Sequence, residues 1–361
     1  MRRAYLFLVS LFVIGVIGAI VACNVGGFDP QSKIDSVRIL GVRADKPYAK
    51  PGETVTLDVL MVDGRREKPQ AAKLYWIPVV CVNPRDDLYY LCFSQALAGD
   101  GGLADGGTQL IPAGPLADAG APEAGANAGG GNPIARIPRG IDLGPFLPQG
   151  PTFSFRMPDN AVQPRQGTTP YGLAIVFNIA CAGQVRLAEV DPARGPQQVP
   201  IQCTDPEGTP LEPKDYVISI NRVYSYTDRT NTNPVIEKIT LDGVDVDPQK
   251  GITLDKCVAS RRSECKEWKI DIKVSDGSWE ENPSEMVSGQ ALREQIWATY
   301  YSDLGDMDNV ARLLFDTRRG RVSESDVVYR APYDPAEGTI WAVVHDNRAG
   351  AAFVVLPLHV K

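Results

Sequence analysis

Residues and motifs that carry common catalytic chemistry are scarce in this sequence. Its 361 residues include only two histidines, His345 and His359. No G-x-S-x-G elbow, P-loop or H-E-x-x-H motif occurs. Asp346 follows His345 directly, and because strand neighbours point to opposite faces, this pair does not predict a catalytic triad. We therefore expect a protein that is not an enzyme, with a glycosidase-like hydrolase as the least favoured alternative, since paired carboxylates leave no sequence motif.

Basic runs and short cysteine spacings are absent as well. Lysine and arginine number 37 against 44 aspartates and glutamates, which gives a net charge of −7. Nucleic-acid binding requires clustered cations, so we expect no nucleic-acid partner. No cysteine pair has the spacing of a zinc site. Helical periodicity is rare, whereas 34 glycines and 29 prolines separate runs of β-branched residues, and this composition predicts an all-β fold.

The N-terminus has the three parts of a secretory signal. Two arginines precede an apolar run over residues 4–22, and small residues come before a cysteine. Residues 20–23, Ile-Val-Ala-Cys, resemble the lipobox of bacterial lipoproteins. That resemblance implies a signal peptide over residues 1–22, cleavage before Cys23, and attachment of diacylglyceryl and palmitate-like acyl chains to this cysteine.

The acyl chains define where the mature protein is expected. Two or three chains anchor a protein stably in a membrane, whereas one chain is marginal. The alternative is an uncleaved anchor helix, since about 20 apolar residues span a bilayer; glycines at 15 and 18 interrupt this run. Asn24 stands where lipoproteins retained at the inner membrane of enteric bacteria have aspartate. The resemblance therefore implies an outer-membrane lipoprotein that contacts the membrane through its lipid anchor.

Six further cysteines remain, an even number that is typical of disulfides in an oxidising compartment. Six cysteines allow many pairings, and the sequence alone does not decide among them. Pairing sequence neighbours closes the shortest loops, and we favour Cys81 with Cys92, Cys181 with Cys203, and Cys257 with Cys265. Each disulfide would contribute about 2–4 kcal/mol.

The chain beyond Cys23 contains the same order of elements twice. An alternating strand that ends in Asp-Gly occurs at residues 57–64 and again at 270–277. A strand with a tryptophan, a strand closing on proline and an apolar strand then follow, at 73–78, 155–158 and 173–176 in the first copy and at 295–300, 329–332 and 341–344 in the second. Each copy also has a first strand, at 37–42 and 235–241, and a last strand, near 216–220 and 353–360. Roughly seven short strands with turns between them predict a β-sandwich.

A tryptophan on the third strand of each copy resembles immunoglobulin-like folds. We interpret Trp76 and Trp297 as core residues of the two copies. The copies depart from antibody domains, because no cysteines are placed to bridge the second and sixth strands. Trp341 aligns with Leu173 of the first copy, so we interpret it as core too, in preference to a binding face on the hairpin 341–355.

Three motifs narrow the resemblance: Lys-Pro-Gly-Glu-Thr-Val-Thr-Leu at 50–57, Cys-Thr-Asp-Pro-Glu-Gly at 203–208 and Trp-Ala-Val-Val-His-Asp-Asn-Arg-Ala-Gly at 341–350. In the first, Pro-Gly makes a turn and the alternation begins the second strand. The motifs are similar to those of the tandem Ig-like lipoproteins common in Gram-negative bacteria such as myxobacteria. The resemblance implies an all-β fold of two tandem Ig-like β-sandwich domains after a lipoprotein signal peptide. It implies no active site.

The expected organisation is a lipid-anchored tether at 23–34, a first domain at 35–226, a polar linker at 227–234 and a second domain at 235–361. Within the first domain, residues 96–140 consist mainly of glycine, alanine, proline and aspartate, which cannot bury a core. We expect this insertion to be a disordered surface loop. The alternative is a loop that orders on a partner or on calcium through Asp100 and Asp105.

Oxygen ligands crowd the turn after the second tryptophan strand: Asp303, Asp306, Asp308 and Asn309. Calcium takes 6–8 oxygens, so this turn is a weak candidate for a Ca²⁺ site. It lacks the glycine and the distal glutamate of an EF-hand loop, and acidic turns are commonly just solvated. We expect no other cofactor.

These features favour a non-catalytic, membrane-anchored lipoprotein that acts in envelope scaffolding, adhesion or complex assembly. Its expected partner is an envelope protein or a glycan. The alternative is a glycan- or peptidoglycan-binding module that uses loops at one end of a sandwich. The largest pocket distinguishes these functions: converging aromatic rings favour a glycan, facing carboxylates favour a glycosidase, and a flat surface favours a scaffold.

Overall fold

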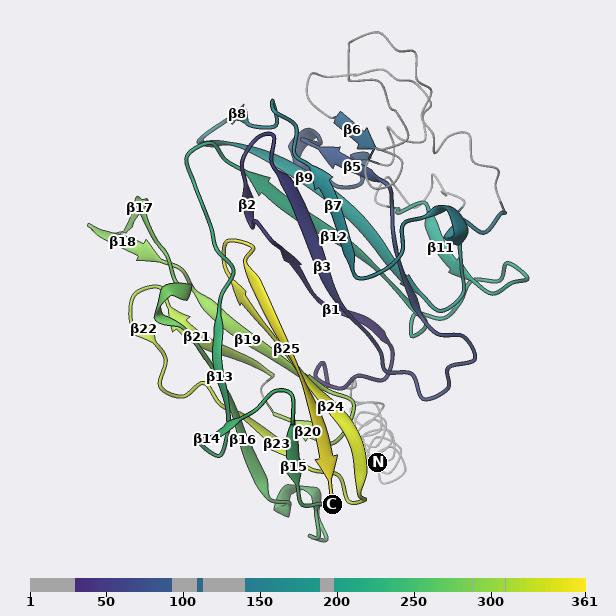
Figure 1. The fold of residues 1–361 in the computed structure, drawn as a ribbon, viewed down its shortest axis with the longest axis vertical. Helices are drawn as coiled ribbons and strands as arrows, with labels where there is room; N and C mark the ends of the chain where they lie inside the picture. Colours follow the sequence, from purple (N-terminus) through teal and green to yellow (C-terminus); the bar gives the residue numbers. More distant parts are fainter. Residues whose placement is uncertain (1–29, 93–108, 113–139, 189–197, 288, 309) are drawn as a thin grey trace, which may run out of the picture.

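The computed structural model describes residues 30–92, 109–112, 140–188, 198–287, 289–308 and 310–361. The expected signal peptide, Cys23, most of the insertion at 96–140 and Asn309 lie outside these residues. The described chain is all-β and forms two sandwiches, one above the other in Figure 1.

The first sandwich has a three-stranded and a larger sheet. The three-stranded sheet orders β1 (Val37–Ala44), β3 (Thr54–Asp63) and β7 (Thr152–Arg156). The larger one orders β2 (Tyr48–Ala49), β12 (Tyr216–Ser225), β9 (Thr168–Cys181), β5 (Val79–Val82) and β6 (Gln109–Pro112), with β4 (Lys73–Trp76) and β8 (Gln163–Arg165) also paired to β9. A separate hairpin joins β10 (Gln184–Leu187) and β11 (Ile201–Thr204).

The second sandwich repeats this plan. One sheet orders β14 (Val244–Val246), β13 (Ile236–Leu241), β16 (Glu267–Val274), β23 (Val327–Arg330) and β20 (Asp306–Met307). The other orders β15 (Ile252–Leu254), β25 (Ala351–Val360), β24 (Ala336–Asp346), β19 (Ile296–Ser302), β21 (Ala311–Asp316) and β22 (Gly320–Arg321). A hairpin of β17 (Glu281–Val287) and β18 (Gln290–Arg293) stands apart.

The strand order is the same in both sandwiches. In each sandwich, one sheet contains the first strand, the alternating strand and the strand that closes on proline (β1-β3-β7 and β13-β16-β23). The other contains the last strand, the apolar strand and the tryptophan strand (β12-β9-β4 and β25-β24-β19). In each copy a short strand after the first one pairs in parallel with the last strand, β2 with β12 and β15 with β25. This is an immunoglobulin-like arrangement, and it confirms the predicted all-β, Ig-like fold.

Trp76 lies in the core of the first sandwich, as predicted. It is fully buried, stacks on Phe153 at 4.9 Å between ring centroids, and donates its Nε1–H to the carbonyl of Gly150 at 2.9 Å. The core prediction for Trp297 is wrong. Ile296, Ala298 and Tyr300 of β19 face the core, and the period of two puts Trp297 on the opposite face, half-buried.

A hydrophobic interface joins the sandwiches face to face. Trp341 and Val343 on the outer face of β24 are buried with Ile34 and Leu40, and partly buried residues of β3, β19 and β25 pack around them. Trp341 is therefore buried, as expected, but against the first domain and not in its own sandwich core. In Figure 1, β1 and β3 lie beside β24 and β25. The result is four β-layers in succession.

The expected tether is part of this interface at its C-terminal end. Lys33 forms a parallel bridge with Ser302. The amide of Ile34 donates to the carbonyl of Ser302 at 2.9 Å, and the amide of Ser302 donates to the carbonyl of Ser32 at 2.8 Å. Residues 32–34 of the expected tether therefore join the second sandwich.

The polar linker forms hydrogen bonds with both sandwiches. Asn233 donates its Nδ2 to the carbonyl of Ala44 in β1 at 2.7 Å and accepts from the amide of Ala351 in β25 at 2.9 Å. Asn231 is buried and donates to the Asp346 carboxylate at 3.2 Å. These bonds attach the linker to strands of both sandwiches.

The outer face of the larger sheet in the first sandwich has its own cover. A second apolar cluster contains Ile175, Phe177 and Ile179 of β9, together with residues from the loops around it. Two disulfides lie in this cover, Cys81–Cys92 and Cys181–Cys203, and a third, Cys257–Cys265, closes a loop of the second sandwich. All three pair sequence neighbours. Residues 109–112 of the insertion form β6 on β5, so the expectation of an unstructured loop is wrong there.

Candidate functional site

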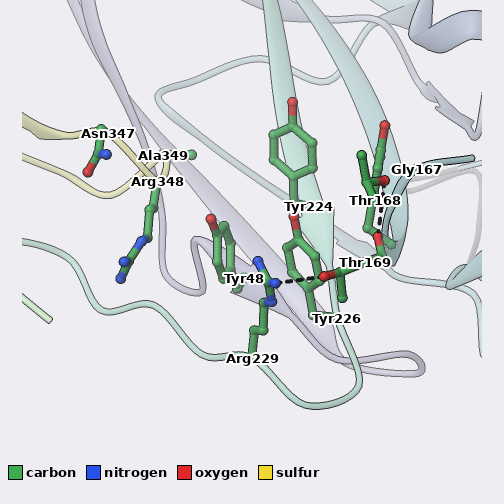
Figure 2. Close-up of a pocket in the computed structure, with 11 residues that line it drawn as sticks. Tyr48, Gly167, Thr168, Thr169, Tyr224, Tyr226, Arg229, Asn347, Arg348 and Ala349 are labelled. Carbon is green, nitrogen blue, oxygen red and sulfur yellow. Dashed lines mark hydrogen bonds between the residues drawn. The ribbon is translucent and has the colours of Figure 1, made fainter. Parts of the chain in front are cut away.

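A groove of about 800 Å³ opens between the two sandwiches. Figure 2 shows its two sides: side chains of the first sandwich face a turn of the second. Residues of both form its lining: Tyr48, Gly167, Thr168, Thr169, Tyr171, Tyr224, Tyr226, Arg229, Asn347, Arg348 and Ala349. Among these described lining residues, four are tyrosines and none is aspartate or glutamate.

The strand pairing gathers the four tyrosines. Tyr224 of β12 pairs with Tyr48 of β2, and its other neighbour on β9 lies two residues from Tyr171. Tyr226 follows two residues after Tyr224, and its amide donates to the carbonyl of Ala49 at 3.0 Å. Because residues two apart share a face of a strand, the rings meet on one side of the sheet.

The rings form a connected set. The centroids of Tyr48 and Tyr226 are 4.7 Å apart, and Tyr171 lies 5.7 Å from Tyr224 and 6.2 Å from Tyr226. Tilted and edge-to-face contacts of this kind add about 0.5–1.5 kcal/mol each beyond buried area. The tyrosines therefore hold one another in place and present a preformed aromatic wall.

Tyr171 is fixed from behind. Its hydroxyl donates to the Asp87 carboxylate, and the guanidinium of Arg165 stacks on its ring at 4.6 Å. Burial and the hydrogen bond to Asp87 raise the pKa of Tyr171 to about 12, so the phenol stays neutral at ordinary pH. On the rim, Arg229 donates to the Thr169 hydroxyl at 2.7 Å and lies 5.4 Å from the Tyr226 ring centroid.

The opposite wall is the tight turn between β24 and β25. The buried Asp346 carboxylate accepts from the amides of Arg348 and Gly350, each at 2.7 Å. Ala349 has a φ of 73°, a left-handed conformation that non-glycine residues rarely adopt. A side chain at Gly350 would meet the Asp346 carboxylate at 2.0 Å. The turn is therefore held in one shape by its own carboxylate.

A buried ion pair lies behind this turn. Arg348 is 3.2 Å from Glu294, whose side chain is fully buried. Glu294 also accepts from the amide of Glu280 at 2.9 Å. Burial, with the neighbouring Asp346 charge, raises the pKa of Glu294 to about 7. The pair connects the groove turn to the segment before β19.

The structure separates the carboxylates of the calcium candidate. Asp303 accepts from the amide of Thr339, Asp308 accepts from the amide of Val328, and Asp306 pairs with Arg262. Within the described residues, no group of three or more histidine, cysteine, aspartate or glutamate side chains is placed to hold a metal ion.

The two histidines have separate surroundings. His345 stacks loosely on Trp297 at 5.7 Å, and burial lowers its pKa. Asp346 bonds to the turn on the other face of β24, as its position in the strand predicted. His359 pairs with Glu337 on the surface.

The tyrosines of the groove were missed by the sequence analysis. Tyr224 and Tyr226 alternate as strand residues do, which was the available signal. Their partners Tyr48 and Tyr171 are far away in sequence and meet them only through sheet pairing, and the second wall requires the docking of two domains.

No family model and no curated protein matches this chain. Among solved structures, the D00-D0 domain of intimin aligns over 88% of this chain and 99% of its own, at 8% identity and a TM-score of 0.21. Alpha-2-macroglobulin of Escherichia coli, activated by porcine elastase, aligns over 93% of this chain and 23% of its own, at 10% identity and a TM-score of 0.17. Dimeric latent PorU from Porphyromonas gingivalis aligns over 91% and 24%, at 10% identity and a TM-score of 0.19.

In the part of the chain that the structure describes, no helix is long and apolar enough to cross a membrane. The Ig-like assignment rests on the strand order given above.

Proposed function

We propose that this chain is a lipid-anchored protein of the bacterial outer membrane that binds an envelope glycan, without catalysis, in the tyrosine groove. The observation that carries the proposal is the aromatic wall: four tyrosines converge on a groove of about 800 Å³. Tyrosine offers a rigid apolar face for the C–H face of a sugar and a hydroxyl for its polar groups. The groove volume is within the range that encloses small ligands.

Two independent features, one from the structure and one from the sequence, support an exported location. Three disulfides are stable in an oxidising compartment. The lipobox-like residues 20–23 supply the anchor, as in the tandem Ig-like lipoproteins that the chain resembles. Replacing Cys23 with serine should abolish incorporation of labelled palmitate and leave an uncleaved precursor. Normal processing of that variant would contradict the proposal that Cys23 carries a lipid anchor.

The non-catalytic part of the proposal is supported by the chemistry of the lining. Glycosidases use two facing carboxylates about 5–10 Å apart, and the described lining residues include neither aspartate nor glutamate. Tyr171 keeps a neutral phenol because its pKa is about 12. The groove therefore offers stacking and hydrogen bonding.

Binding is tested with the full lipidated chain in detergent. The probe is soluble glycan strands released from peptidoglycan, and the measurement is isothermal titration calorimetry. We expect Tyr224→Ala to weaken binding about tenfold, because a ring face is lost. Tyr333→Ala is the matched control, since Tyr333 is 44% exposed and lies outside the groove. Equal binding by the Tyr224→Ala chain would contradict a site in this groove.

A second candidate function is envelope scaffolding or adhesion. The observation that favours it is the buried interface around Trp341, which makes a stiff four-layer body from two domains. Cross-linking in intact cells, followed by purification through the lipidated chain, tests it. Recovery of a defined envelope protein in place of glycan would favour this function.

A further inference from the structure

We infer that the groove binds its glycan with both domains at once, and that Asn347 of the second domain is a specificity-determining hydrogen-bond donor to that ligand. This inference rests on the proposed glycan function. Asn347 would be a second contact point for the ligand, in addition to the tyrosines. It would distinguish between glycans that stack equally well on the tyrosine rings.

The orientation of the Asn347 amide is set by its neighbour. The amide of Gln295 donates to Asn347 Oδ1 at 3.1 Å, and the amide of Asn347 donates to the carbonyl of Gln295 at 3.1 Å. A backbone N–H needs an acceptor, so the side-chain oxygen must point toward Gln295. The side-chain nitrogen, which carries two donors, then points the other way.

The nitrogen points into the groove. Asn347 lines the groove and is exposed there. Figure 2 shows Asn347 beyond Arg348 and Ala349 as seen from Tyr48, with its amide nitrogen on the side of the tyrosines. An extended ligand that lies on those rings and reaches past Arg348 therefore meets a donor of fixed direction, which suits a sugar hydroxyl, a ring oxygen or an acetamido carbonyl.

The spacing between donor and rings is fixed by the junction. Asp346 holds the turn that carries Asn347, and Asn231 of the linker donates both to the Asp346 carboxylate at 3.2 Å and to the carbonyl of Arg348 at 3.0 Å. The hydrophobic interface around Trp341 joins the same two domains. A preorganised pair of walls loses little entropy when the ligand binds.

The variant that isolates this contact is Asn347→Asp. The carboxylate keeps an oxygen for the Gln295 amide and removes the nitrogen donors, but it adds a negative charge, which the Asn347→Ala variant does not. The probe is the soluble peptidoglycan strands used above, titrated into the full lipidated chain. We expect an unchanged melting temperature and binding about three- to tenfold weaker, as for the loss of one hydrogen bond. Asn347→Ala, which loses both functions of the side chain, should weaken binding at least as much.

The outcomes separate this inference from the proposed function. Weaker binding by both Asn347→Asp and Tyr224→Ala supports the two together. Weaker binding by Tyr224→Ala alone overturns the role of Asn347 and leaves the tyrosine site intact. If neither variant differs from wild type, the groove is not the site. If the wild type binds no strand, the proposed function itself falls.

Discussion

The outer faces of two equivalent sheets are covered in different ways. In the first sandwich, β9 is buried on both faces, because loops carrying the disulfides Cys81–Cys92 and Cys181–Cys203 cover its outer side. In the second, the equivalent strand β24 buries Trp341 and Val343 against the first domain. The same fold therefore has an equivalent apolar face in each copy. The first copy covers this face with its own disulfide-bearing loops, and the second covers it with the neighbouring domain.

This difference explains why the two domains pack against each other and do not form separate units. An apolar face of several large residues is costly in water. The disulfide-bearing loops cover this face in the first sandwich, whereas the second sandwich depends on a partner domain to cover it. The hydrogen bonds of Asn231 and Asn233 in the linker keep the first domain next to the second.

The largest effect is expected from Trp341→Ala, which removes the centre of the interdomain cover. Loss of a buried tryptophan costs about 3–5 kcal/mol. We expect calorimetry to resolve two unfolding transitions in place of a coupled one, with the second domain at the lower temperature. Trp297→Ala, on the same outer face but half-buried, is the control and should change much less. A single, unshifted transition in the Trp341 variant would show that the domains unfold independently of this contact.

Replacing both Cys181 and Cys203 with alanine removes a disulfide from the loops that cover β9 of the first sandwich. We expect the first sandwich to lose about 2–4 kcal/mol in denaturant unfolding, because the disulfide constrains the unfolded chain. The second domain should be affected only through the shared interface. The matched control is Cys257→Ala with Cys265→Ala, which should destabilise the second sandwich instead. Equal losses in both domains from either pair would contradict separate covers.

A smaller effect is expected from Gly41→Val in β1. A Cβ at this position would lie 2.9 Å from a methyl of Val343 and 3.7 Å from the Phe353 ring, so the larger side chain pushes β1 away from β24. Overpacking of this kind costs about 1–3 kcal/mol. Gly277→Ala is the control, because nothing lies within 4 Å of its Cβ position. Limited proteolysis of the linker should accelerate only in the Gly41 variant.

The smallest effect concerns pH at the junction. Burial raises the pKa of Glu294 from its usual 4.5 to about 7 in the folded protein. Between these values the folded state binds more protons than the unfolded state, so this group's stabilisation is lost as pH rises through about 7. We expect the unfolding free energy to fall between pH 5.5 and 8 by on the order of 1 kcal/mol through this group. Glu294→Gln should flatten that slope in denaturant titrations, and an unchanged slope would refute the assignment.

Local pattern was enough to predict the strands and their repetition. Alternation along residues 270–277 and the tryptophan strand at 73–78 gave the correct elements, because burial on one face of a strand produces period two. Trp297 was misassigned because tryptophan was taken to mean core. Its neighbours Ile296 and Ala298 carried the true register.

The interface and the groove depend on contacts between distant segments, which local pattern does not encode. The apolar runs at 173–176 and 341–344 were predicted as strands, and such runs are typical of strands that are covered on both faces. The identity of each cover, a loop or a domain, required the fold. The sequence identified Asn347 only as part of a turn motif. The orientation of its side-chain amide depends on its contact with Gln295, which only the structure shows.

Ile34 has a consequence for the order of assembly. The ribosome makes this residue before either sandwich, yet its final neighbours Ser302 and Trp341 belong to the last third of the chain. The hydrogen bond between Ile34 and β19 can therefore form only after the second domain has been made. Strands β19 and β24 thus set in place a segment that was made long before them.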